Sequence, residues 1–245
     1  MPTAKPAKTH DRFTSRGQAV ARFVAQRGLL KGVVWGVVAV TVVGKEKLKG
    51  LKGPFVVVAN HSSHLDAPLI MGALPGKLAR YLAAGAAGDY FFDVWWRRGL
   101  TALFFNAFPV DRSGNNPRNV SAKTLLEHDV PVLVFPEGTR SKNGVPGHFK
   151  PGAAALSSST GAPILPIAII GAHESHPRGS KWPTMGLPVG VVFGSPMTAK
   201  PGENPTQFMA RVRDQVVAMH DQHSAHILDK HSPDPQRSPD GKKKK

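Results

Sequence analysis

The stretch VVVANHSSHLDAPLI, residues 56–70, decides the fold class. Its run of valines at 56–58 is typical of a buried β-strand. Asn60 and His61 then fall where the strand ends, and Asp66 with Pro68 marks the start of a helix, with Asp66 as a possible cap. The polar residues therefore lie in a strand-to-helix loop, where α/β proteins gather ligands and catalytic groups.

Apolar segments of this kind alternate with helical patterns along the chain. Strands are predicted at 38–43, 55–59, 132–135, 164–170 and 189–193, and helices at 13–36, 67–74 and 119–127. A last helix begins with Asn204 as its cap and Pro205 at its first position. The alternation predicts a single-domain α/β sandwich with a mixed central sheet. We expect a basic N-terminal segment (1–36), the main domain (37–228) and a disordered basic tail (229–245).

The charge balance points to an anionic partner. The 245 residues include 32 Lys and Arg against 16 Asp and Glu, a net charge of +16 at pH 7. Such a surplus favours nucleic acid or an anionic membrane surface. The chain has no Cys, which excludes a disulfide framework and thiol catalysis.

The N-terminal segment mixes basic and apolar residues. Its apolar run after Lys31 ends at Gly44, which is shorter than the roughly 20 residues of a membrane-spanning helix. Two interpretations remain open: a basic helix that lies in a membrane interface, or a helix packed on the domain. The amphipathic pattern is imperfect, because Arg22 falls off the basic face.

His61 and Asp66 are candidates for proton transfer. A His can accept a proton near neutral pH, and a carboxylate on its other ring nitrogen fixes the tautomer and stabilises the imidazolium. The alternative is an Asp that only caps a helix and a His that only bonds the backbone. The G-x-S-x-G nucleophile motif is absent. The His would therefore have to activate a hydroxyl group of the substrate.

A second polar loop follows the predicted strand in VLVFPEGTRSKNG, residues 132–144. It carries Glu137, Gly138, Thr139 and Arg140, and Lys150 lies a few residues beyond. Glycine permits close backbone approach, and arginine can grip a phosphate with two hydrogen bonds. The alternative is a turn with a surface ion pair between Glu137 and Arg140.

Four motifs occur in the order NHSSHLD (60–66), FPVDR (108–112), FPEGTRS (135–141) and APILPIA (162–168). Together they resemble the four sequence blocks of the glycerolipid acyltransferase family, which includes 1-acylglycerol-3-phosphate acyltransferase. The segment from His61 to Asp66 fits the His-x4-Asp block, and Arg112 ends the second block. The third block is matched in full, and Pro166 lies in the apolar fourth block.

The resemblance implies a role for each matched residue. His61 would be the general base on an acceptor hydroxyl, and Asp66 would orient it. Arg112, Arg140 and Lys150 would bind the acceptor's phosphate. Glu137 would position the glycerol part or the loop, with Thr139 beside it in the substrate site. Gly138 and neighbouring backbone N–H groups would be candidates for stabilising the oxyanion.

The resemblance also implies the partners. The donor would be acyl-CoA or acyl carrier protein, and the acceptor a lysophospholipid, with 1-acylglycerol-3-phosphate giving phosphatidic acid as the first choice. No acyl-enzyme, metal or redox cofactor would be needed. The enzyme would sit on the cytoplasmic face of the cell membrane, peripheral or monotopic, on anionic lipid. Asn106 and Pro109 depart from residues common in the family, which leaves a different acceptor open.

Other readings concern different classes of protein. A zinc hydrolase is suggested by His173, Glu174 and His176, but the spacing of these residues is not H-E-x-x-H. Histidines also recur at three-residue steps on the last helix, at 220, 223 and 226. The net charge suits a basic membrane- or nucleic-acid-binding protein, yet the chain lacks RNP-like aromatic residues, so nucleic acid is not expected. Trp95 and Trp96 either dock on lipid or belong to the core. A family member without activity is the last alternative.

Overall fold

The computed structural model describes residues 11–87, 104–110 and 121–229. In the N-terminal half these form α1 (Asp11–Thr14), α2 (Arg16–Val24), the π-helical η1 (Ala25–Leu30), α3 (Lys31–Val37), β1 (Ala39–Val43), the 3-10 helix η2 (Lys45–Leu48), β2 (Val56–Ala59), α4 (Asp66–Ala73), α5 (Gly76–Ala79) and β3 (Ala83–Ala87). The remainder comprises β4 (Phe108–Val110), α8 (Ala122–Glu127), β5 (Val132–Val134), α9 (Gly152–Thr160), β6 (Ile164–Ile170), α10 (Ala172–Ser175), β7 (Pro188–Phe193) and α11 (Pro205–Asp229).

The described strands form one mixed sheet of seven, in the order β1-β7-β6-β2-β5-β3-β4. All neighbouring pairs are parallel except β6 and β7, which are antiparallel. The carboxyl ends of β6, β2 and β5 therefore meet at one edge, with β2 in the middle. The predicted α/β fold with a mixed central sheet is confirmed.

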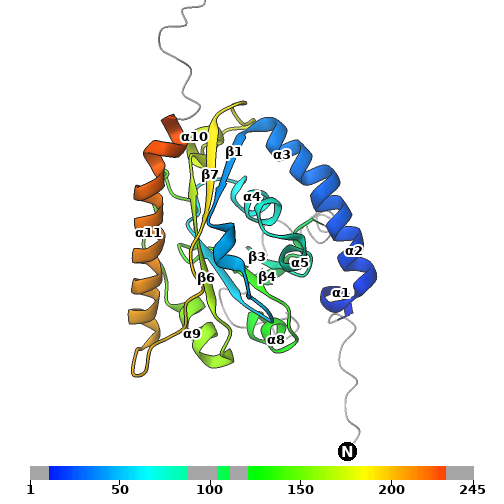
Figure 1. Ribbon diagram of the computed structural model, residues 1–245, viewed down its shortest axis with the longest axis vertical. Coiled ribbons are helices and arrows are strands. Elements are labelled where there is room, and N and C mark those ends of the chain that lie inside the picture. The colour runs from blue at the N-terminus through cyan, green and yellow to red at the C-terminus, as the bar shows by residue number, and fades with distance from the viewer. Residues whose placement is uncertain (1–10, 88–103, 111–120, 230–245) are drawn as a thin grey trace, which may run out of the picture.

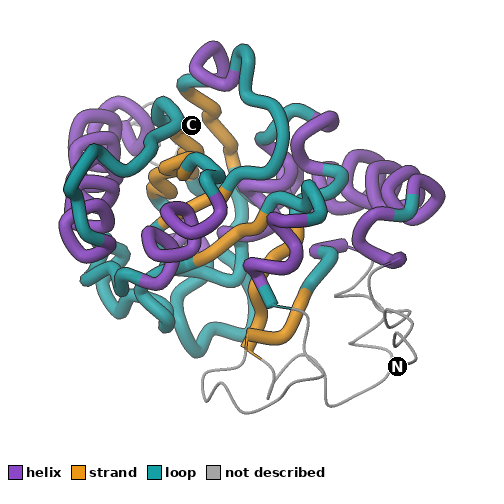
Figure 2. Tube along the Cα trace, turned by 90° about the horizontal axis from the view of Figure 1, so that it is seen from below, coloured by secondary structure: helices purple, strands orange, loops and turns teal. Residues whose placement is uncertain are grey.

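Helices cover both faces of this sheet (Figures 1 and 2). The strands are buried on both sides, so their sequences are continuously apolar. Along β2, for example, Val56 and Val58 join the core under α9 and α11, whereas Val57 and Ala59 join the core under α4. This alternation follows from the period of two in a strand.

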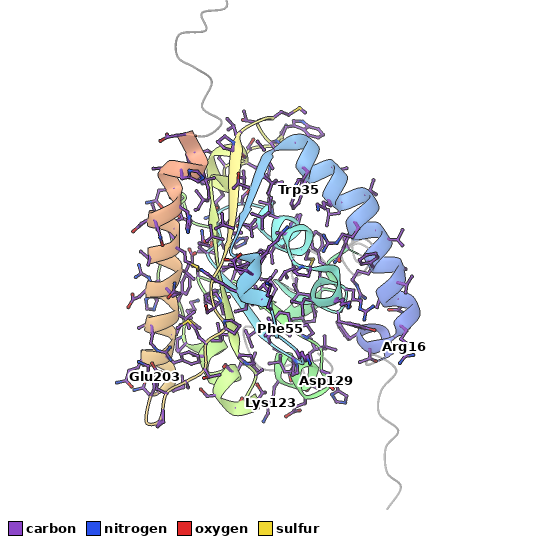
Figure 3. All side chains as sticks on the ribbon, in the orientation of Figure 1. Arg16, Trp35, Phe55, Lys123, Asp129 and Glu203 are labelled. Atoms are coloured by element: carbon purple, nitrogen blue, oxygen red, sulfur yellow. The ribbon has the colours of Figure 1, made fainter. Side chains whose placement is uncertain are left out.

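The N-terminal helices run along the outside of the α4 layer (Figure 1). Trp35 points from α3 toward α4, where it leaves no room for a side chain at Gly72 (Figure 3). Arg22, which broke the amphipathic pattern, is buried and donates hydrogen bonds to the Arg80 carbonyl (2.8 Å) and to Asn106 Oδ1 (2.8 Å). One face of this segment is therefore packed on the domain.

The opposite face of the N-terminal segment is exposed and apolar. It carries Val20, Phe23, Val24, Leu29 and Val33. Both sequence interpretations thus keep a physical basis, because the segment is tied to the domain and still presents an apolar face. None of the helices within the described ranges has the length and apolar character needed to cross a membrane.

The predicted strands are all found, with ends shifted by at most one residue. The chain is already helical at Asp11, two residues before the predicted start of the first helix, and α11 includes Asp229, the first residue of the predicted tail. β3 and β4 were not predicted from the sequence. The composition of β3, AAGAA, has no β-branched residue, so only its pairing with β5 and β4 identifies it as a strand.

Asn60 fixes the end of β2 against β6. Its buried side chain accepts a hydrogen bond from the Ile169 N–H (2.7 Å) and donates one to the Ile169 carbonyl (2.8 Å). These two bonds satisfy backbone groups that no water reaches, immediately before His61.

We expect Asn60→Ala to lower the free energy of unfolding by about 2–4 kcal/mol, because it leaves two buried backbone groups without partners. Denaturant unfolding followed by circular dichroism measures this change. Asn143→Ala is the matched control, since Asn143 is exposed and bonds only within its own loop. Equal losses for the two variants would contradict the role assigned to Asn60.

Candidate active site

His61 and Asp66 meet at the carboxyl end of β2. His61 Nδ1 lies 2.8 Å from Asp66 Oδ2, and the Asp66 side chain is fully buried. The same oxygen accepts hydrogen bonds from the backbone N–H groups of Ser62 (2.7 Å) and Ser63 (2.9 Å). Asp66 is the first residue of α4 rather than its cap, and its carboxylate reaches back to curl the loop. The alternative in which Asp66 only caps a helix and His61 only bonds the backbone is wrong.

The His61 ring is oriented for proton transfer at its other nitrogen. A carboxylate on Nδ1 makes that nitrogen the donor, which places the lone pair of the neutral ring on Nε2. The ring stacks on Phe135, with centroids 4.1 Å apart, and 23% of the side chain is exposed. No residue in the described ranges hydrogen-bonds Nε2. The nitrogen that would accept a proton is therefore available to a bound molecule.

Glu137 holds the His61 loop from the neighbouring strand. Its Oε1 accepts a hydrogen bond from the His61 N–H (2.9 Å), and the Ser141 N–H donates to the His61 carbonyl (2.7 Å). Glu137 was predicted to position either the glycerol part of the acceptor or the loop, and the structure shows its contact with the loop. Burial raises the pKa of Glu137, although hydrogen bonds from the N–H groups of His61 and Gly147 act in the opposite direction.

The predicted phosphate-binding residues lie beside Glu137. Gly138 adopts a left-handed conformation (φ +73°), and the Lys150 ammonium lies close to its Cα, so that an added Cβ would be 3.1 Å from Nζ. Thr139 and Lys150 are exposed, and Arg140 is half-buried. No ion pair joins Glu137 and Arg140. The loop thus presents basic side chains to solvent next to His61.

One predicted role disagrees with the geometry. The Gly138 N–H donates to the Phe135 carbonyl (3.1 Å), which closes the turn after β5. This N–H is already engaged, so it does not serve as the predicted oxyanion donor in this conformation.

Two features singled out in the sequence lie outside the described residues: Arg112, and the pair Trp95 and Trp96. Asn106, which departs from residues common in the resembled family, is described. It has φ +48° and is held by Arg22 and by the Tyr81 carbonyl. Asparagine tolerates this left-handed conformation better than most residues.

His64 remains apart from the proton-transfer pair. Partial desolvation, followed by the positive charge of Arg140, lowers the pKa of His64 to about 4. Its ring lies at a tilt against His176, with centroids 5.8 Å apart. His64 is therefore neutral at physiological pH.

Histidines elsewhere do not assemble into a metal site within the part of the chain that the structure describes. No group of three or more His, Asp or Glu side chains there is arranged to hold an ion. His173 and His176 lie at α10, whereas the other histidines of the zinc reading lie along α11. The zinc-hydrolase alternative thus gains no ligand set from these residues.

Sequence reasoning missed the contacts that orient the site. Phe135 was read only as the end of a strand, and the N–H groups of Ser62 and Ser63 were not considered. The FPEGTRS motif indicated that Phe135 and Glu137 lie near the site. It did not predict that Phe135 stacks on the His61 ring or that Glu137 accepts a hydrogen bond from the His61 N–H. A hydroxyl group placed at Nε2 would therefore meet an oriented base, a buried carboxylate behind it and a basic loop beside it.

Comparison with known proteins places this geometry in a family. The sequence model described as "Acyltransferase" matches residues 39–170. Over 123 residues the chain is 40% identical to 1-acyl-sn-glycerol-3-phosphate acyltransferase alpha of Homo sapiens, a match that covers 47% of this chain and 40% of that protein. It is 30% identical over 147 residues to the chloroplastic 1-acyl-sn-glycerol-3-phosphate acyltransferase LPAT1 of Arabidopsis thaliana, covering 58% and 39%.

A solved structure is similar over most of the chain. The 1-acyl-sn-glycerophosphate (LPA) acyltransferase PlsC of Thermotoga maritima superposes with a TM-score of 0.67 at 28% identity, covering 85% of this chain and 83% of that one. The curated relatives, in contrast, are matched over less than half of their own length.

The raised pKa of Glu137 predicts a pH-dependent effect on stability. Below the ordinary pKa of 4.5 this contribution to folding is fully present, and it is lost as the pH rises through the raised value in the folded state. Glu137→Gln removes that titration. We therefore expect the free energy of unfolding of the variant, relative to that of wild type, to increase as the pH rises above 4.5, because only wild type loses this contribution.

Denaturant unfolding at a series of pH values measures the difference between the two proteins. Glu127→Gln on α8 is the control, because Glu127 is half exposed and makes only a surface ion pair with Lys123. A flat or falling difference for Glu137→Gln would show that burial does not dominate the environment of that carboxyl group.

Proposed function

Because this chain belongs to the Acyltransferase family, we propose that it transfers a fatty acyl group from a thioester donor to the free hydroxyl of 1-acylglycerol-3-phosphate, giving phosphatidic acid. The observation that carries the proposal is the pair His61–Asp66, 2.8 Å apart, with no hydrogen bond to Nε2 from the described residues. The names of the relatives, 1-acyl-sn-glycerol-3-phosphate acyltransferases, support this acceptor.

In the proposed mechanism, His61 Nε2 takes the proton of the acceptor hydroxyl as its oxygen attacks the thioester carbonyl carbon. Asp66 stabilises the resulting imidazolium, because its buried carboxylate already bonds Nδ1. The tetrahedral intermediate then collapses, the carbon–sulfur bond breaks, and the imidazolium returns its proton to the leaving thiolate. No acyl-enzyme forms and no metal or redox cofactor takes part.

The acceptor's phosphate would bind the basic loop after β5. Arg140 and Lys150 supply the cations, Gly138 allows Lys150 to approach the backbone closely, and Thr139 adds an exposed hydroxyl. Arg112 would complete this set. Glu137 would act through the His61 loop, whose backbone it holds.

The donor would be acyl-CoA or acyl carrier protein, used at an anionic membrane surface on the cytoplasmic side. The exposed apolar face of the N-terminal helices and the net charge of +16 support a peripheral attachment. A domain spanning residues 37–228 would then carry the chemistry, with the preceding segment at the lipid.

We expect His61→Ala to reduce acyl transfer by about 100- to 10,000-fold, since a positioned general base contributes that much. The assay supplies long-chain acyl-CoA with lysophosphatidic acid and follows both thiol release and the lipid product. His226→Ala, an exposed histidine of α11, is the matched control and should keep wild-type activity.

Full activity in His61→Ala would overturn the mechanism. Activity that depends on His61 but prefers another lysophospholipid would correct the acceptor. A wild-type protein inactive with every acceptor and with both donors would support the binding-protein reading instead.

Lys150→Ala tests the acceptor's phosphate. Loss of a charge-assisted contact should raise the KM for lysophosphatidic acid about tenfold. The rate with a monoacylglycerol, which has no phosphate, should change little. Steady-state kinetics with both acceptors separates the two effects, and Lys77→Ala on α5 serves as a charge-matched control. A similar loss with both acceptors would assign Lys150 to loop structure rather than to phosphate binding.

A further inference from the structure

A basic pocket lies beside the active site, and the mechanism above does not use it. It is an open depression of about 500 Å³, lined among the described residues by Lys142, His173, Pro177 and Arg178. This volume lies in the range of small-molecule sites, roughly 300–1,000 Å³. The pocket is therefore large enough for a phosphorylated ligand.

The pocket lies between two loops that flank the end of β2. On one side, the loop after β5 crosses over the His61 loop, where Ser141, the residue before Lys142, donates its N–H to the His61 carbonyl. On the other side, the turn after β6 is tied to the same loop, because Ser63 Oγ donates to the His176 carbonyl (3.0 Å). The two sides meet where Gly144 packs against His173. The pocket thus borders the loop that carries the base.

The polar groups of the pocket lack partners of opposite charge. Lys142 and Arg178 form no ion pair within the described ranges, and none of the described lining residues is acidic. The Glu174 carboxylate lies beside Gly144, where an added Cβ would be 3.3 Å from Oε1, and Glu174 is not among the described lining residues.

Buried polar atoms without a partner also gather on this turn. They are Nδ1 of His173, Oγ of Ser175 and Nδ1 of His176. Buried polar groups are usually satisfied by protein, water or a ligand, so such a cluster indicates a place that a bound molecule or water completes.

Resting on the proposed function, we propose that this pocket binds the phosphate groups of the acyl donor. Acyl-CoA and acyl carrier protein both carry the thioester at the end of a phosphopantetheine arm, which separates phosphate from sulfur. A phosphate held by Lys142 and Arg178 would let that arm reach His61 across the rim of the pocket. The nucleotide of coenzyme A offers further phosphates to the same cations.

The arrangement assigns the two substrates to different basic groups. Lys150 lies against Gly138, on the Glu137 side of the loop after β5, and suits the acceptor. Lys142 lines the pocket together with residues of the turn after β6, and β6 lies on the opposite side of β2 from β5. Each anionic substrate then has its own cations, and the base lies between the two sites.

The test measures binding of adenosine 3′,5′-bisphosphate, coenzyme A and glycerol 3-phosphate to the full-length protein by isothermal titration calorimetry. Lys142→Ala/Arg178→Ala should weaken both nucleotides about tenfold or more, since each lost cation removes a charge-assisted contact. Affinity for glycerol 3-phosphate should stay within about twofold. Lys77→Ala/Lys123→Ala removes the same charge from exposed positions elsewhere and should change none of the three. Lys142→Arg/Arg178→Lys should restore binding.

Three results would overturn the proposal: no binding of either nucleotide to wild type, equal weakening by the control pair, or a selective loss of glycerol 3-phosphate. The last result would assign the pocket to the acceptor.

Failure of the proposed function is distinguishable from failure of the proposed donor site. If nucleotides bind in the pocket but the protein transfers no acyl group, the proposed reaction is wrong and the proposed site stands. If the protein transfers acyl groups and the double variant leaves the KM for acyl-CoA unchanged, the reaction stands and the site is wrong.

Discussion

The buried carboxylate of Asp66 is the contact on which the site depends. Its Oδ2 contacts Nδ1 of His61 and accepts hydrogen bonds from the N–H groups of Ser62 and Ser63, and these contacts close the loop between β2 and α4. These donors stabilise the buried Oδ2 and restrain the loop, whereas the other carboxylate oxygen, Oδ1, is buried without a partner in the described residues. The same bonds orient the His61 ring and leave Nε2 without a hydrogen bond from the described residues. Loop structure and base orientation are thus one arrangement rather than two.

The sheet supplies the second constraint. Because β6, β2 and β5 are parallel neighbours, the loops that follow them meet at one edge. The β5 loop contributes Glu137 to the His61 backbone, and the β6 turn receives a bond from Ser63. Asn60 locks β2 to β6 directly before the base. A site assembled this way tolerates surface variation, because its positions are set by strand pairing.

The sequence predicted what local periodicity and spacing encode. Continuous apolar runs identified the central strands, and the His-x4-Asp and FPEGTRS motifs identified the residues at their ends. What it could not predict depends on contacts distant along the chain. The β3 strand, rich in alanine, is defined only by its pairing, and Arg22 breaks a helical pattern because it reaches Asn106, 84 residues away. The Gly138 N–H was assigned to an oxyanion, yet the turn itself uses it.

Electrostatics explains why the proposed base, His61, would need its carboxylate. Cations that attract anionic substrates also oppose a positive charge on a neighbouring imidazole. Partial desolvation, in first place, and the positive charge of Arg140, in second, lower the pKa of His64, three residues from His61, to about 4. A desolvated histidine beside such cations would be a poor acceptor of a proton. Asp66, 2.8 Å from His61 Nδ1, places a carboxylate against the ring, while Arg140 and Lys150 lie on the loop beside it. In the proposed mechanism, this short-range pairing beside basic side chains would let one edge of the sheet both bind anions and accept a proton.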